Sequence, residues 1–176
     1  MRFEFPVAGP GISGKFNTSL TGRSKTMLLT RQTDYGLRML IYLALHPERR
    51  ATALEIADAF QISQNHLLKL IQRLAGAGVV NTYRGKGGGV ALASPPKDIR
   101  VGDVVRELEH GLEVIDCNRP LCPIAPACDL REVLAGARDA FLAVLDDCTL
   151  EDVVHRRRDT LRLLVSSHES GMGDDR

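Results

Sequence analysis

The sequence has no long hydrophobic run. None of its 176 residues belongs to an uninterrupted apolar stretch of about 18 or more, the length that a membrane-spanning helix requires. The first 26 residues also lack the sustained apolar stretch of a secretory signal, and Gly and Pro interrupt them. These absences exclude a transmembrane protein and predict a cytoplasmic one that has no membrane partner.

Several catalytic motifs are missing as well. The chain has no C-x-x-C pair, which a thiol-redox protein, the alternative from a different class, would need. The glycine-rich stretch Arg84–Gly89 does not fit G-x4-G-K-[ST], and no helix is expected after it, so it is not a nucleotide-binding loop. No set of residues suggests hydrolysis or group transfer. We therefore expect a protein that is not an enzyme.

The net charge of +1 hides a strong division along the chain. Residues 1–26 carry a net charge of +3 and residues 27–100 carry +5, whereas residues 101–176 carry −7. A basic segment next to an acidic one is typical of a protein that contacts nucleic acid with one part only. The basic segment 27–100 is therefore the expected site of DNA contact.

Hydrophobic periodicity predicts three helices in this basic segment. The first begins after Thr30 and ends before His46, and the second opens on the capping box Thr52-x-x-Glu55 and ends at Phe60. After a tight turn, Ser63 is placed to cap a third helix, which Gly76 and Gly78 end. Two short helices joined by a tight turn are typical of a helix-turn-helix, and the third helix would then be the one that reads DNA.

The residues after these helices predict a wing. A short apolar stretch precedes the basic glycine-rich turn, and a second one, Val90–Ala93, follows it. Glycine allows a tight loop to approach a phosphate backbone, and two cations supply the charge. The predicted DNA-binding residues of the helix and the wing are Ser63, Gln64, Asn65, His66, Lys69, Arg84 and Lys86. For Gln64 and Asn65 the alternative is an exposed polar face, and for His66 it is packing in the core.

Three of the four cysteines lie close together in a proline-containing loop. Cys117, Cys122 and Cys128 follow the spacing C-x4-C-x5-C. Thiolates are soft ligands that favour iron–sulfur clusters, zinc or copper(I), and structural zinc usually takes paired C-x2-C knuckles. The wider spacing favours a cluster over zinc, with a labile disulfide or three ordinary thiols as the alternatives. Cys148 is predicted to be a small buried side chain rather than a fourth ligand.

A heptad pattern follows the cysteine loop. Apolar residues spaced alternately by four and three form a seam that consists of Leu130, Leu134, Ala137, Phe141, Val144 and Cys148. Such a seam on a small protein predicts an interface between two copies of the chain. A dimer also suits a helix-turn-helix, because two copies can read half-sites about 34 Å apart.

These features predict a mainly α-helical chain: a winged helix-turn-helix DNA-binding domain with a small β wing, followed by a cluster-binding loop and a long dimerisation helix. Met27 is a candidate start of the folded unit. The expected segments are a disordered N-terminal extension at 1–26, the DNA-binding domain at 27–100, a short helix and the cluster-binding loop at 101–128, the dimerisation helix at 129–154 and a C-terminal tail at 155–176.

Residues 27–154 resemble winged-helix regulators of the IscR type and, within them, the nitric-oxide-sensing NsrR repressors. The resemblance lies in Met27-Leu-Leu-Thr-x-x-Thr-Asp34-Tyr-Gly-Leu-Arg38, Ser63-x-Asn65-His66-x-x-Lys69, Arg84-Gly-Lys-x-Gly-Gly89, Ile99-Arg-Val-Gly-Asp-Val-Val-Arg-Glu-Leu-Glu109 and Cys117-x4-Cys122-x-Ile-x-Pro-Ala-Cys128. IscR itself has a histidine three residues beyond the last cysteine, where this chain has Arg131, and this difference favours the NsrR type.

The resemblance implies an iron–sulfur cluster held by Cys117, Cys122 and Cys128. In NsrR proteins an aspartate near the start of the first helix of the other protomer can complete a 4Fe–4S site, and Asp34 occupies the matching position. It also implies a homodimeric repressor that releases the operator DNA of nitric-oxide-detoxification genes when nitric oxide reacts with the cluster. The cluster is expected to be 4Fe–4S, with 2Fe–2S as the alternative. A regulator of the same fold that senses iron, iron–sulfur status or redox state is the alternative function.

Overall fold

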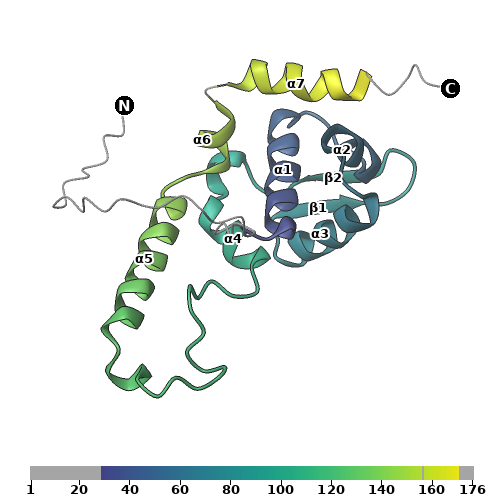
Figure 1. Ribbon diagram of the computed structural model, residues 1–176. Coiled ribbons are helices and arrows are strands. Elements are labelled where there is room, and N and C mark those ends of the chain that lie inside the picture. Colours follow the sequence, from purple (N-terminus) through teal and green to yellow (C-terminus); the bar gives the residue numbers. More distant parts are fainter. Residues whose placement is uncertain (1–28, 156, 171–176) are drawn as a thin grey trace, which may run out of the picture.

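The computed structural model describes residues 29–155 and 157–170, which form a mainly helical fold with one small two-stranded antiparallel sheet (Figure 1). The predicted fold class, a winged helix-turn-helix followed by a further helical part, is confirmed. The extension expected at 1–26 and the candidate start at Met27 lie outside the described residues. No helix in the described ranges is long and apolar enough to cross a membrane.

Three helices form the core of the part that is expected to bind DNA, and their ends follow the local sequence. Helix α1 (Arg31–Leu45) begins after Thr30, whose side-chain oxygen accepts a hydrogen bond from the Thr33 N–H. Helix α2 (Ala53–Phe60) opens on the predicted capping box, and helix α3 (Gln64–Gly76) begins after Ser63, whose side chain makes no capping bond. The apolar face of α1 packs against α2 and α3, which buries Met39, Leu40, Leu43, Ile56, Leu67 and Leu74.

The predicted wing is a hairpin fastened to the loop between α1 and α2. Strands β1 (Val80–Tyr83) and β2 (Gly89–Leu92) pair antiparallel, with Val80 opposite Leu92. Val90 and Ala51 exchange two backbone hydrogen bonds, at 2.8 and 3.0 Å. The short 3-10 helix η1 (Pro96–Asp98) then leads to helix α4 (Val101–Leu108), which packs on α1.

The cysteine loop and the following helix extend away from this core (Figure 1). Between α4 and α5 the chain is irregular, apart from the 3-10 helix η2 (Ala125–Ala127). Helix α5 (Asp129–Asp146) contacts the core at its C-terminal end and buries one side chain, Leu142. Within the described residues, most of α5 is therefore open to solvent.

The dimerisation helix expected at 129–154 is divided in two. Helix α5 ends at Asp146, and helix α6 (Leu150–His155) begins anew. Thr149 starts α6 by donating its N–H to the Asp152 carboxylate, while its hydroxyl accepts the Asp152 N–H. The seam residue Cys148 therefore lies in the turn, where its carbonyl accepts the Val101 N–H at 2.9 Å.

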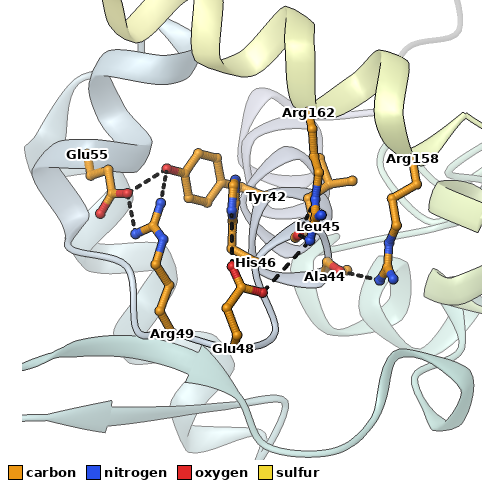
Figure 2. A network of polar contacts seen from close by, with 9 residues as sticks. All are labelled: Tyr42, Ala44, Leu45, His46, Glu48, Arg49, Glu55, Arg158 and Arg162. Carbon is orange, nitrogen blue, oxygen red and sulfur yellow. Dashed lines mark hydrogen bonds and ion pairs between the residues drawn. The ribbon is translucent and has the colours of Figure 1, made fainter.

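The segment expected to be a C-terminal tail, 155–176, contains a helix that packs on the core. Helix α7 (Arg158–Ser170) lies across α2 and α1, and Val165 is buried there. Figure 2 shows Arg158 and Arg162 reaching the C-terminal end of α1, where they donate to the carbonyls of Ala44 and Leu45. These carbonyls have no partner within their own helix, so the two arginines fix α7 to α1.

Candidate functional site

Helix α3 exposes a polar face and buries an apolar one. Leu67, Leu70, Ile71 and Leu74 pack inward, because residues three and four apart share one side of a helix. The predicted DNA-binding residues of this part, Ser63, Gln64, Asn65, His66 and Lys69, are all exposed. The structure thus places them together on the outer surface of the second helix of a helix-turn-helix, and His66 is not a core residue.

The wing turn carries its two cations at the surface. Arg84 and Lys86 are both exposed. Gly85 and Gly87 have φ values of 85° and 80°, a conformation that residues with a Cβ rarely adopt. The glycine-rich sequence is therefore what lets the two strands turn within so few residues and present both cations at the tip.

A further cation at the base of the wing was not identified from the sequence. The guanidinium of Arg50 lies 3.6 Å from the centre of the Tyr83 ring, so the two side chains stack. Arg50 is exposed and comes from the loop that pairs with β2. A stacked guanidinium keeps its N–H edge available for a phosphate. In the sequence, the basic pair Arg49–Arg50 shortly before the second helix is the feature that could have indicated this additional cation.

The three cysteines of the loop are close in sequence, but their thiols do not form a cluster in space. Cys117, Cys122 and Cys128 are all free and partly buried. The Cys122 N–H donates to the Cys117 carbonyl at 2.9 Å, and Cys128 occupies the N-cap of α5 without making a side-chain capping bond. Within the described residues, no group of three or more Cys, His, Asp or Glu side chains is close enough to hold a metal ion.

The chemistry around the loop nevertheless fits an iron–sulfur group. Three cysteines that form no disulfide supply soft ligands on one short segment. A cavity of about 690 Å³ lies between the loop and the start of α5, and Cys117 lines it together with three arginines and two acidic residues: Arg119, Arg131, Arg138, Glu113 and Asp116. The donor set is present in this chain, and the loop would have to close to bring the three sulfurs together.

Asp34 lies elsewhere on the same chain. It is in the first turn of α1, and its carboxylate accepts a hydrogen bond from the Arg38 Nε at 2.8 Å. Its side chain is partly exposed, and it joins no metal-binding group with the loop cysteines of the described chain. Any contribution of Asp34 to a site on a second copy would require it to exchange this ion pair.

Cys148 differs from the loop cysteines in its surroundings. Burial, and then the nearby Asp152 carboxylate, raise the pKa of the Cys148 thiol above its ordinary value. The thiol also donates weakly to the Thr149 carbonyl at 3.6 Å. The Cys148 side chain is partly buried rather than fully buried, and a raised pKa disfavours the thiolate, the form of cysteine that binds metal ions. That Cys148 is not a fourth ligand stays a prediction.

Comparison with known proteins identifies relatives of this fold. The Rrf2 family model, described as an iron-dependent transcriptional regulator, matches residues 29–156, which is most of the chain. The solved structure of CymR from B. subtilis, described as the global cysteine regulator, is 34% identical and covers 73% of this chain and 97% of its own, with a TM-score of 0.63.

Two further structures have similar values. IscR from T. potens is 28% identical and covers 85% of this chain and 95% of its own, with a TM-score of 0.60. CymR from Staphylococcus aureus is 30% identical over 70% of this chain and 95% of its own, with a TM-score of 0.58. With a winged helix-turn-helix of matching architecture and a family model that spans most of its length, this chain belongs to the Rrf2 family of transcriptional regulators.

Proposed function

We propose that this regulator is a homodimeric DNA-binding repressor of the NsrR type, which senses nitric oxide through an iron–sulfur cluster held by Cys117, Cys122 and Cys128. The observation that carries the proposal is the placement of three free thiols on one loop, between helix α4, which packs on α1, and the exposed helix α5. A change in this loop is thus positioned to alter the relation between the two parts.

The DNA contact would be made by α3 and the wing. The exposed face of α3 offers Asn65, His66 and Lys69 to the major groove, where polar side chains distinguish base pairs. Arg84 and Lys86 at the tip of the wing, together with Arg50 at its base, would bind phosphates and set the orientation. Ser63 and Gln64 stand at the start of α3, the end that meets base edges in helix-turn-helix proteins.

The three cysteines and their surroundings would hold the cluster. An iron–sulfur cluster, 4Fe–4S in the first instance and 2Fe–2S as the alternative, supplies the iron that reacts with nitric oxide. Cys128 at the start of α5 and Cys117 at the cavity wall would couple the position of that helix to the presence of the cluster. The partner's Asp34 would be the fourth ligand in a 4Fe–4S site, as a harder oxygen donor than the thiolates.

Dimerisation would follow from the apolar seam of α5. Leu130 and Val144 are 58% and 57% exposed in the single chain, which is unusual for large apolar side chains at heptad spacing. Pairing two copies of α5 would cover the seam and place two α3 helices on one face of the DNA. Loss of cluster ligation would then shift the spacing between the two reading helices and weaken operator binding.

The test is DNA release by nitric oxide. Protein purified without oxygen is mixed with fluorescent operator DNA, which is first obtained by selecting bound fragments from genomic DNA, and anisotropy is followed while a nitric-oxide donor is added. We expect DNA release with the wild-type protein. A Cys122→Ala variant should show no response to the donor, and Cys148→Ala should respond like the wild type. Release that is equal in all three proteins would contradict the proposal.

A second function in the same family is regulation by cysteine or redox state. It is favoured by one observation: all three loop thiols are free and partly exposed, and the chain is 34% identical to a protein described as a global cysteine regulator. In that case, DNA release would follow addition of cysteine or a mild disulfide oxidant to colourless, iron-free protein. Nitric oxide would then have no effect on DNA binding.

A further inference from the structure

A second cavity lies beside helix α3, and none of the three loop cysteines lines it. It has a volume of about 440 Å³ and is lined by the start of α1, by one side of α3 and by His110, just after α4. From α3, the cavity is lined by His66, Lys69, Leu70 and Arg73, which recur at helical spacing along one side. His110 lies at the start of the irregular segment that leads to the cysteines, but no cysteine and no residue of the wing lines the cavity.

The walls of this cavity carry positive charge and no acid. Arg31, Lys69 and Arg73 contribute cations, and no Asp or Glu is among the lining residues. Arg73 is held in place, since it donates to the Glu107 carboxylate and to the Leu108 carbonyl. In the part of the chain that the structure describes, neither Arg31 nor Lys69 forms an ion pair with an acidic side chain.

The acidic groups at this end of α1 already have other partners. Glu109 accepts the backbone N–H of Thr30 at 2.8 Å, and Asp34 is paired with Arg38. Neither carboxylate lines the cavity. Arg31 and Lys69 therefore line the cavity, and no acidic side chain of the described residues balances their charge there. This arrangement favours an anionic ligand.

The size and lining of the cavity specify the ligand further. Its volume lies in the range of about 300–1,000 Å³ that is typical of small-molecule sites, and a single phosphate would fill only a small part of it. Tyr35 and Leu70 supply apolar wall beside the cations. A ligand with a charged end and an apolar body matches both kinds of wall.

We propose that this cavity binds a small organic anion, such as a carboxylate or sulfonate that carries an apolar or aromatic group. His66 and Lys69 belong both to the cavity and to the proposed DNA-contacting face. The ligand therefore competes with DNA and gives the regulator a second input, independent of the cysteine loop. Only this competition, and not the binding of the anion, rests on the proposed function.

The binding test uses 8-anilinonaphthalene-1-sulfonate, a fluorescent sulfonate with an aromatic body, and the full-length protein. We expect saturable binding at one site per chain, displaced by benzoate but not by the uncharged benzamide of the same shape. Arg31→Gln and Lys69→Gln should each weaken binding of the probe by about tenfold, because each removes one charge-assisted contact. Arg84→Gln, on the wing, is the matched control and should bind the probe like the wild type.

Competition is measured by adding nonspecific double-stranded DNA at low salt to the protein–probe complex. We expect DNA to displace the probe, and the probe to weaken DNA binding. The cavity proposal is overturned if benzamide displaces the probe as well as benzoate does, or if Arg31→Gln and Lys69→Gln leave its affinity unchanged. If the probe binds as expected but the wild-type protein binds no DNA, the proposed function fails and the anion site stands.

Discussion

The side chains around Tyr42 show how single residues connect the helices of the DNA-binding part. The Tyr42 ring is fully buried in α1, and its hydroxyl donates to the Glu55 carboxylate at 2.7 Å. Arg49 donates to the same hydroxyl and also forms an ion pair with Glu55 (Figure 2). Glu55 further accepts the Thr52 N–H, so one carboxylate joins α1, the loop and the start of α2.

Glu55 gives a prediction for acid stability. Burial alone would raise the pKa of its carboxyl, but the hydrogen bonds from Tyr42, Arg49 and Thr52 outweigh burial and leave the pKa below its ordinary value of 4.5. A carboxyl whose pKa is lower in the folded state stabilises the fold above its ordinary pKa, and this stability is lost as the pH falls through the lowered value.

We expect Glu55→Gln to lower the free energy of unfolding at neutral pH by about 1–3 kcal/mol, because it removes charged hydrogen bonds of a partly buried group. The variant should also lose less stability than the wild type between about pH 5 and pH 3. Urea unfolding across this range, with Glu132→Gln on the exposed face of α5 as a control, measures both effects. An equal loss of stability in acid for all three proteins would contradict this account of Glu55.

The wing depends on close contact between its second strand and the loop before α2. Gly89 has a φ of 151°, and a Cβ at this position would lie 2.6 Å from the Ala51 carbonyl oxygen. That oxygen belongs to the backbone pair with Val90 that fastens the wing, so it has little freedom to move. A side chain at residue 89 would push β2 away from the loop.

We expect Gly89→Ala to destabilise the protein by roughly 2 kcal/mol and to weaken DNA binding, because it combines a strained backbone conformation with a backbone clash. Gly76→Ala is the matched control, since a Cβ there meets nothing within 4 Å and alanine is favourable in a helix. Denaturant unfolding and DNA titration of both variants test the prediction. It is wrong if the two substitutions have the same effect.

Helix α7 is anchored by arginine hydrogen bonds as well as by buried apolar side chains. Arg162 donates from two nitrogens to the Leu45 carbonyl, whereas Arg157 is exposed. We expect Arg162→Ala to lower the free energy of unfolding by about 1 kcal/mol and to speed hydrogen exchange of the α7 amides. Arg157→Ala should change neither. Unchanged exchange of α7 in Arg162→Ala would mean that apolar packing alone holds the helix.

Local patterns predicted the elements whose ends are set by neighbouring residues. The capping box of α2, the apolar side of α3 and the glycine turn of the wing each lie within about ten residues of sequence, and the structure has all three. The packing of α7 could not be found in this way. It depends on Arg158 and Arg162 meeting α1 carbonyls that are 114 and 117 residues away in the chain.

The break between α5 and α6 could be predicted from a capping motif in the sequence, but the heptad pattern predicts one continuous helix. Thr149 and Asp152 form a reciprocal cap, and Thr149-x-x-Asp152 is visible in the sequence. At the candidate site, the cysteine loop was predictable from composition. The cavity beside α3 was not, because Arg31, Lys69 and His110 come together only when α1, α3 and the end of α4 pack.

The whole molecule is proposed to work as a dimer through α5. Val144 lies on the seam and is 57% exposed in the single chain, while Ala143 is exposed beside it but off the seam. We expect Val144→Asp to weaken the dimer strongly, since it buries a charge in an apolar interface, and Ala143→Asp to leave it intact. Sedimentation velocity measures the mass of each, and circular dichroism checks the fold. Dimers of equal strength in both variants would place the interface elsewhere.

The central claim is that three cysteines of one loop hold an iron–sulfur cluster in a dimeric regulator. Native mass spectrometry of protein purified without oxygen measures the cluster and the stoichiometry together. We predict a dimer whose excess mass matches an iron–sulfur cluster in each chain, lost in Cys122→Ala and retained in Cys148→Ala. A wild-type dimer that carries stoichiometric zinc, or no added mass, would contradict the claim.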